Sequence, residues 1–198
     1  MRVVLASTSP RRVELLTQLF DELGLPHTFA IEPPSVDETP HEGESPRDLA
    51  LRLAHAKASV VASRHRDDDE PPLVIGADTV VDVDGESLGQ PRDIDDARRM
   101  LRRLSGRSHR VHTGVCVLHG SREARDVATA LVEMHPLDDV TLERYLATGE
   151  PLGKAGAYAI QGEGAVLVVR YVGSLTGIIG LPLETVSRLV GNLGLSWN

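Results

Sequence analysis

The sequence predicts an α/β fold, a mixed twisted sheet with flanking helices that is divided into two lobes by a central cleft. Short apolar runs typical of buried strands alternate with segments whose apolar residues recur every three to four positions. Aromatic residues make up only 3% of the 198 residues and hydrophobic residues of all kinds 41%, so the core must be aliphatic. Because no repeat or linker interrupts the chain, residues 1–198 are expected to form one bilobed domain.

The first half of the chain predicts three strands, two helices and a hairpin. Val3–Ala6 is apolar throughout, and Ser9 and Pro10 suit the N-cap and the first position of the helix that follows. The apolar face of this helix consists of Val13, Leu16, Leu19, Phe20 and Leu23. The remaining elements are a strand at Phe29–Ile31, a helix from Pro46 to Arg64 after a proline-rich acidic loop, a strand over Leu73–Val81 and a hairpin turn at Asp84-Gly85.

The second half of the chain predicts three helices and three strands. The helices are expected at Ile94–Leu104, Leu137–Thr148 and Pro182–Leu193, and the strands at Arg110–Leu118, Ala124–Met134 and Val166–Val172. The segment Gly153–Gly164 contains too much glycine for a plain helix and presents backbone N–H groups beside Lys154. It lacks the Gly-Lys-Ser/Thr ending of a Walker A loop, so its spacing alone is weak evidence for phosphate binding.

Composition and charge restrict the class of partner. The net charge of −8 leaves no broad basic face, so binding to nucleic acid or to an anionic membrane is not expected. A lone cysteine, Cys116, lies in an apolar run and is predicted to be a small buried side chain, and the eight histidines show no metal-ligand spacing. No run approaches membrane-spanning length and no cleavable leader is recognisable, so a cytoplasmic protein is expected. Homodimer formation is left open.

Two consecutive arginines stand where helix physics disfavours cations. Arg11 and Arg12 fall in the first turn of a predicted helix, next to the positive end of the helix dipole. The plain alternative is a helix that begins with two exposed surface arginines. The hydroxyls of Ser7 and Thr8 and the helix N-terminus would meet both guanidinium groups at one point. This combination predicts an anion site, and phosphate is the anion that fits it best.

Three further residues are candidates for chemistry. Asp78 ends a buried strand, where a carboxylate is costly unless it is paired or holds a metal. Glu38 lies in the acidic loop, where a merely solvated carboxylate is the plain alternative. Lys57 lies among alanines on a helix, and the sequence by itself favours a lysine whose ammonium reaches solvent. Asp82 and Asp84, close to the hairpin, are predicted to be solvated turn residues.

Several short blocks, in order along nearly the whole chain, carry a resemblance. The blocks are residues 5–12, 36–38, 56–58, 76–81, 104–106, 154–158, 160–162 and 180–184. Together they resemble the Maf proteins, nucleoside triphosphate pyrophosphatases with the inosine-triphosphatase-like fold. The blocks around the double arginine and around Asp78 are the most specific. The resemblance covers one domain and extends over both predicted lobes.

The resemblance implies hydrolysis of a nucleoside triphosphate to the monophosphate and pyrophosphate with Mg²⁺, or alternatively Mn²⁺ or Co²⁺. It implies that Asp78 is the general base and that Glu38 and Asp78 hold the metal. The residues that it places around the triphosphate are Ser7, Arg12, Lys57 and Lys154. Arg11, Thr79 and Gln161 match positions of the branch that prefers dTTP and UTP over 7-methyl-GTP. Removal of non-standard nucleotides is the physiological role that this activity would suit.

Two departures from the family pattern leave other functions open. Gln90 stands where the family usually has lysine, and Gly153 stands where it usually has aspartate. Both changes affect the phosphate end of the site, so a non-catalytic nucleotide-binding regulator linked to septum formation or cell division is the main alternative. A second alternative starts from Asp82–Glu86, which superficially resembles the motif of aspartyl-phosphate phosphatases of the haloacid dehalogenase type. Free phosphate as the product would support that reading.

Overall fold

A seven-stranded mixed sheet organises the computed structural model, which describes residues 1–197. The strands are β1 (Val3–Ala6), β2 (Phe29–Ile31), β3 (Leu73–Val83), β4 (Glu86–Leu88), β5 (Ser108–His119), β6 (Arg122–Met134) and β7 (Val168–Val172). Their order is β2-β1-β3-β5-β6-β7, and β4 pairs with β3 beside this path. β1 is parallel to β2 and β3, whereas the other pairs are antiparallel. The predicted α/β class and mixed sheet are therefore confirmed.

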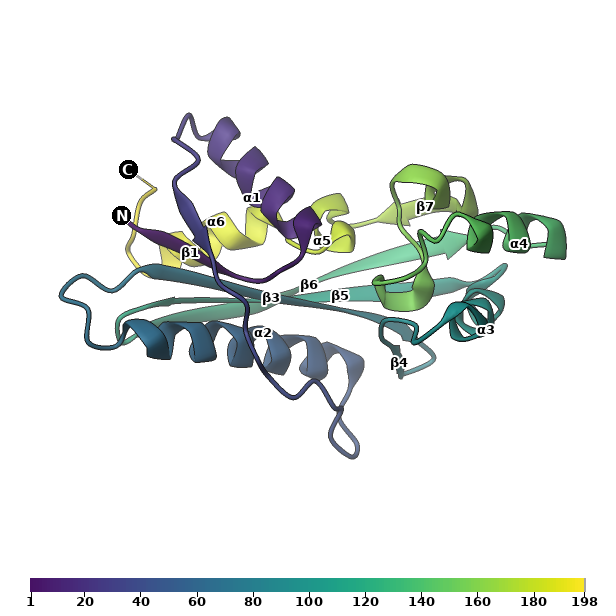
Figure 1. Ribbon diagram of the computed structural model, residues 1–198, viewed down its shortest axis with the longest axis horizontal. Helices are drawn as coiled ribbons and strands as arrows, with labels where there is room; N and C mark the ends of the chain where they lie inside the picture. Colours follow the sequence, from purple (N-terminus) through teal and green to yellow (C-terminus); the bar gives the residue numbers. More distant parts are fainter. Residues whose placement is uncertain (198) are drawn as a thin grey trace.

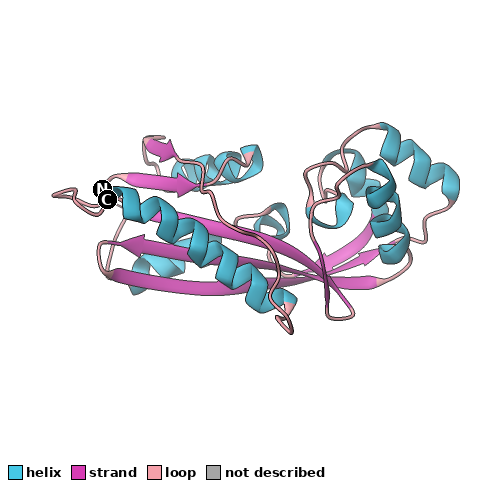
Figure 2. Cartoon of the chain, turned by 60° about the horizontal axis from the view of Figure 1, so that its bottom comes forward, coloured by secondary structure: helices cyan, strands magenta, loops and turns pink. Residues whose placement is uncertain are grey.

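The helices cover both faces of the sheet at one end and gather at its other end. They are α1 (Pro10–Glu22), α2 (Pro46–Ala62), α3 (Ile94–Leu104), α4 (Asp139–Ala147), α5 (Leu175–Ile179) and α6 (Leu183–Asn192). Three 3₁₀ helices add η1 (Ser63–His65), η2 (Ala155–Ala157) and η3 (Gly162–Leu167). Figure 1 shows α2 on one face of the sheet and α1 and α6 on the other, with α3 and α4 at the far end. The long strands β3, β5 and β6 run through both groups (Figure 2).

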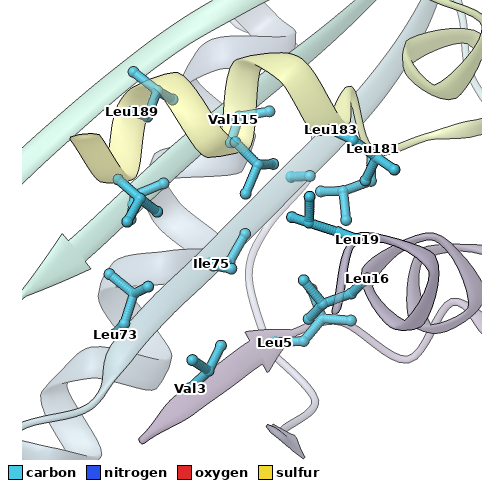
Figure 3. Packing of buried hydrophobic residues seen from close by; sticks show 14 of the residues in the cluster. Val3, Leu5, Leu16, Leu19, Leu73, Ile75, Val115, Leu181, Leu183 and Leu189 are labelled. Atoms are coloured by element: carbon cyan, nitrogen blue, oxygen red, sulfur yellow. The ribbon is translucent and has the colours of Figure 1, made fainter. Parts of the chain in front are cut away.

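Two large apolar clusters correspond to the two lobes. In the first, Leu5, Ile75 and Val115 of the sheet pack against Leu16 of α1 and Leu189 of α6, as Figure 3 shows. The second gathers β3, β5 and β6 with α3 and α4. Both clusters are aliphatic apart from a few rings, as the low aromatic content predicted. One continuous sheet therefore carries a core at each end, and the region between the cores is where a cleft can open.

Helix α2 lies unusually close to the sheet because both surfaces are small. A Cβ added to Gly76 would stand 2.5 Å from Ala54 O, and one added to Gly114 would stand 2.3 Å from Ala50 O. Contacts this short exclude any larger side chain at either glycine. The alanines that the sequence places around Lys57 therefore allow the helix backbone to approach β3, which carries Asp78.

Some local predictions need correction. Ser9 occupies the N-cap position of α1, but its side chain makes no capping hydrogen bond. Leu23 follows the helix and is 42% exposed instead of belonging to its buried face. Asp82, predicted to be a solvated turn residue, is buried: its Oδ1 accepts the Gly85 N–H at 2.8 Å, and its Oδ2 lies 3.2 Å from Nε2 of His112. The sheet covers Asp82 because β3 continues to Val83, beyond the end that the apolar run indicated.

Other predictions hold. Cys116 is buried and free. Asp84 and Gly85 both adopt positive φ in the hairpin between β3 and β4, the conformation that this dipeptide favours. No helix among residues 1–197 has the length and apolar content needed to cross a membrane.

Candidate active site

A cleft of about 780 Å³ opens between the two lobes. It is lined by every site residue that the sequence singled out: Ser7, Arg11, Arg12, Glu38, Lys57, Asp78, Thr79, Lys154 and Gln161. Ser7 directly follows β1, and Asp78 lies on the neighbouring parallel strand β3. Residues about 70 positions apart in the sequence thus meet at the end of the parallel strand pair β1 and β3.

A lysine joined to two carboxylates forms the centre of the cleft. The Lys57 Nζ atom lies 2.5 Å from Asp78 Oδ1 and 2.6 Å from Glu38 Oε1. Lys57 and Asp78 are each only 7% exposed. The expectation of a lysine that reaches solvent is therefore wrong, because α2 packs so closely on β3 that the ammonium is directed to Asp78. Burial raises the pKa of Asp78, although the nearby cations Lys57 and Arg12 oppose that rise.

The paired carboxylates fit a divalent cation. Glu38 Oε1 and Asp78 Oδ1 both contact the single Lys57 ammonium, so a divalent cation bound by the same side chains would use their other carboxylate oxygens. Within residues 1–197 no group of three or more His, Cys, Asp or Glu side chains could hold a metal ion. Two carboxylates, with the remaining positions filled by water and substrate phosphate, are the ligand set that Mg²⁺ commonly takes.

The segment after β1 supplies one wall of the cleft. Ser7 Oγ accepts the Ser9 N–H at 3.1 Å, and this contact fixes the turn that leads into α1. Arg12 donates from Nε to Gly180 O at 2.9 Å and from Nη2 to Thr79 Oγ1 at 3.3 Å. Burial lowers the pKa of the Arg12 guanidinium, and Asp78 counteracts that effect. The two hydrogen bonds hold the guanidinium across the cleft, where it can meet an anion.

A glycine-rich loop supplies the opposite wall. Lys154 donates its Nζ to the carbonyl of Glu150, and partial burial lowers the pKa of Lys154. The Glu150 carboxylate in turn accepts the Gly164 N–H at 2.8 Å. Gly162 has a φ of +68°, in the left-handed region that favours glycine. Glu150 therefore orders the loop that carries Lys154 and Gln161.

Sequence reasoning missed Glu150 because a single acidic residue after a helix gives no local signal of its partners. It also missed the significance of lysine usage. The chain contains only two lysines, Lys57 and Lys154, and both line the cleft, whereas arginine supplies all its other permanent side-chain cations. A count of lysines in the sequence would have singled out both without the family resemblance. An ammonium is a compact point charge that can contact both carboxylates from one atom, whereas a guanidinium spreads its charge over a planar fork of donors.

The cation that the family usually has at position 90 is not replaced by the nearest arginine. Gln90 lines the cleft. Arg92 is turned outward, with a side chain that is 78% exposed and an Nε atom 3.1 Å from Asp96 Oδ2. The cleft therefore has an amide at this position in place of a positive charge.

For the pyrophosphatase activity that the sequence resemblance implies, we expect Gln90→Lys to raise kcat/KM by roughly fivefold, because a charge-assisted hydrogen bond exceeds a neutral one by about 1 kcal/mol. Steady-state pyrophosphate release measures the effect. Gln90→Met controls for side-chain length without charge, and Arg92→Ala should leave kcat/KM unchanged. An unchanged or lower value in Gln90→Lys would show that the site is adapted to glutamine.

These features define a class of protein: an α/β protein whose cleft gathers cations and paired carboxylates, a set of groups that suits a polyphosphate ester. The chain belongs to the Maf family, since the family model described as Maf-like protein matches residues 2–193. A dTTP/UTP pyrophosphatase from Anaeromyxobacter sp. (strain Fw109-5) is 46% identical over 100% of this chain and 93% of its own length. A dTTP/UTP pyrophosphatase from Myxococcus xanthus is 47% identical over 98% and 95%.

A solved structure completes the comparison. A nucleoside-triphosphatase (dITP/XTP pyrophosphatase) from Mycobacterium abscessus is similar over 98% of this chain and 94% of its own, with 16% identity and a TM-score of 0.47. The resemblance to the Maf family inferred from the sequence blocks is confirmed by the family match.

Proposed function

We propose that this protein hydrolyses nucleoside triphosphates to the monophosphate and pyrophosphate, with dTTP and UTP as its preferred substrates. The observation that carries the proposal is the buried Asp78 carboxylate in contact with Lys57, at the centre of a cleft whose walls hold Arg11, Arg12 and Lys154. Family membership and the names of relatives 46% and 47% identical support the substrate choice.

In the proposed reaction, Asp78 takes a proton from a water molecule while the oxygen of that water forms a bond to the α-phosphorus. The bond from the α-phosphorus to the bridging oxygen then breaks, and pyrophosphate leaves with that oxygen. A base works best when its pKa lies near the working pH, and burial moves the pKa of Asp78 in that direction. The desolvated carboxylate must still be ionised to act, which the Lys57 ammonium favours.

The cations of the cleft neutralise the charge of the triphosphate in the proposed reaction. A triphosphate carries about four negative charges, and its hydrolysis depends mainly on positioning and electrostatic stabilisation. Arg12 and Lys154 face the cleft from opposite walls, so both can contact phosphate oxygens at once. Glu38 and Asp78 would hold Mg²⁺, Mn²⁺ or Co²⁺, and such an ion supplies neutralisation of the phosphate charge when bound. Ser7 offers a hydroxyl on the same wall of the cleft as Arg12.

The test is one assay with separate readouts for orthophosphate and pyrophosphate. Purified protein is incubated with dTTP, UTP, CTP, ATP, GTP and 7-methyl-GTP, each with Mg²⁺, Mn²⁺, Co²⁺ or EDTA. We expect pyrophosphate from dTTP and UTP in excess over the purine nucleotides, and loss of turnover with EDTA. Arg11, Thr79 and Gln161, which line the cleft, are the residues on which this base preference depends.

The other outcomes identify the alternatives. Binding of UTP without pyrophosphate release under any metal would favour the non-catalytic regulator. Orthophosphate as the product, with an acid-stable but base-labile acyl phosphate on the protein, would favour the phosphatase reading. A preference for 7-methyl-GTP would overturn the substrate choice and leave the reaction class standing.

A further inference from the structure

A buried histidine and a buried tyrosine are paired behind the glycine-rich loop of the cleft. His109 lies on β5, Tyr158 directly follows η2, and both side chains are buried. The His109 Nε2 atom lies 2.7 Å from the Tyr158 hydroxyl oxygen, and the two rings meet edge to face with their centroids 5.4 Å apart. Tyr158 belongs to the apolar cluster of the second lobe and also lines the cleft. The pair therefore connects the core of this lobe to the wall of the cleft.

Packing alone does not explain the histidine. The Nδ1 atom of His109 is buried and has no hydrogen-bond partner within residues 1–197, so Tyr158 is the only hydrogen-bond partner of the ring in that part of the chain. Burial lowers the pKa of His109 to about 4, so the ring is neutral at neutral pH, and a neutral imidazole can pair with a hydroxyl in either tautomer. An apolar side chain would avoid the cost of the unpartnered nitrogen. What the imidazole adds is the hydrogen bond to Tyr158.

The backbone next to Tyr158 needs such an anchor. Gly156 and Ala157 have φ angles of +69° and +61°, and this left-handed conformation is unfavourable for alanine because alanine carries a Cβ. A strained turn persists only where its surroundings hold it in place. Gly156 donates its N–H to Gly89 O at 3.0 Å, and His109 holds the Tyr158 hydroxyl. These two hydrogen bonds tie the turn to the segment after β4 and to β5.

Lys154 begins the same turn. Its carbonyl oxygen accepts the Ala157 N–H at 3.0 Å, and Lys154 and Tyr158 both line the cleft. A displacement of Tyr158 would therefore be transmitted through Ala157 to the lysine four residues earlier in the chain.

We propose that His109 is a positioning residue: its hydrogen bond to Tyr158 holds the turn that presents Lys154 to the phosphate groups of the substrate. The inference rests on the proposed pyrophosphatase activity and extends it to a residue that does not touch the substrate. His109 then contributes to turnover only through Lys154. A group displaced by about 1 Å can cost up to about 10²-fold in rate, so the loss of one anchoring hydrogen bond should be measurable.

The first experiment measures kcat/KM for UTP, by pyrophosphate release, in Tyr158→Phe and His109→Phe. Each variant keeps an aromatic ring and removes one partner of the hydrogen bond. We expect each to lower kcat/KM by roughly tenfold. The double variant should be no more than about twofold worse than the poorer single variant, because both substitutions break the same bond.

Two further variants show whether the hydrogen bond itself is responsible. His109→Gln has a terminal amide that can take the place of Nε2, so it should recover most of the activity that His109→Phe loses. Tyr171→Phe removes a hydroxyl from an exposed tyrosine on β7, so it is the matched control and should leave kcat/KM unchanged.

The second experiment tests whether the pair acts through Lys154. In a Lys154→Met background, Tyr158→Phe should lower kcat/KM by less than about twofold further, because the group that Tyr158 positions is already gone. A further loss of about tenfold in that background would overturn the inference. So would a folded Tyr158→Phe protein whose kcat/KM stays within about twofold of the wild type.

Amide hydrogen exchange over residues 153–161 gives a readout that does not need turnover. Exchange in this segment should be faster in Tyr158→Phe than in the wild type and in Tyr171→Phe, and equal rates in all three would overturn the inference. If His109→Phe does not fold, Tyr158→Phe breaks the same bond and carries the test alone. A wild type that releases no pyrophosphate from UTP refutes the proposed function, and the exchange rates then decide separately whether the pair holds the turn.

Discussion

The Asp78→Asn variant should lose between about 10²- and 10⁴-fold in kcat/KM while remaining folded, which is the usual cost of removing a general base. Asparagine keeps the shape of aspartate but cannot take a proton from water. Lys57 is not left alone in the variant, because its Nζ remains 2.6 Å from Glu38 Oε1. Pyrophosphate release from UTP measures the loss, and thermal melting measures the fold.

The melting temperature supplies a second readout with a defined sign. Burial raises the pKa of Asp78 in the folded protein. A carboxyl whose pKa is higher in the folded than in the unfolded chain stabilises the fold while it is protonated, and that contribution is lost as the pH rises through the folded-state pKa. The melting temperature of the wild type, compared with that of Asp78→Asn at the same pH, should therefore fall as the pH rises.

Asp84→Asn is the matched control for this prediction. Asp84 lies at the exposed end of the same hairpin, pairs with Arg107 and has a positive φ that asparagine also tolerates. Its substitution should change neither kcat/KM nor the melting temperature appreciably. A folded Asp78→Asn protein with more than about a tenth of the wild-type activity would show that Asp78 is not the general base.

Replacement of Lys57 by methionine should have the second largest effect, a loss of roughly 10²-fold in kcat/KM at neutral pH. Lys57 is the cation that most strongly opposes the rise in the pKa of Asp78. Without the ammonium, that pKa rises further, and a larger fraction of the base is protonated. The acid limb of the pH profile of kcat/KM should therefore move to higher pH, and part of the activity should return as the pH is raised.

The control for Lys57→Met is Arg47→Met, which removes an exposed cation from the first turn of the same helix. That variant should keep both the activity and the pH profile of the wild type. If Lys57→Met lowers activity equally at every pH, Lys57 contributes to substrate binding and does not control the pKa of Asp78. If the variant keeps full activity, the ion pair at the centre of the cleft is not used in catalysis.

The sequence alone determined the order of the elements and the chemistry that the cleft contains. Apolar runs located the strands because a buried strand has to be apolar, and helical periodicity located α1 and α3. Arg11, Arg12 and Asp78 could be identified because each is energetically unfavourable in its local environment. Arg11 and Arg12 are cations at the start of a helix, and Asp78 is a carboxylate at the end of an apolar strand. An unfavourable residue of this kind can be recognised from its neighbours in the sequence, without knowing which distant residue it contacts.

Only the tertiary structure decided how these residues are paired. Lys57 and Asp78 are 21 residues apart, His109 and Tyr158 are 49 apart, and Arg12 reaches the Gly180 carbonyl across 168 residues. A side chain on a helix face can be solvated or buried in an ion pair with the same local pattern around it. The choice depends on which distant backbone approaches, and here that approach was permitted by Gly76 and Gly114 beneath the alanines of α2. Close packing therefore turned an ordinary helical lysine into the centre of the cleft.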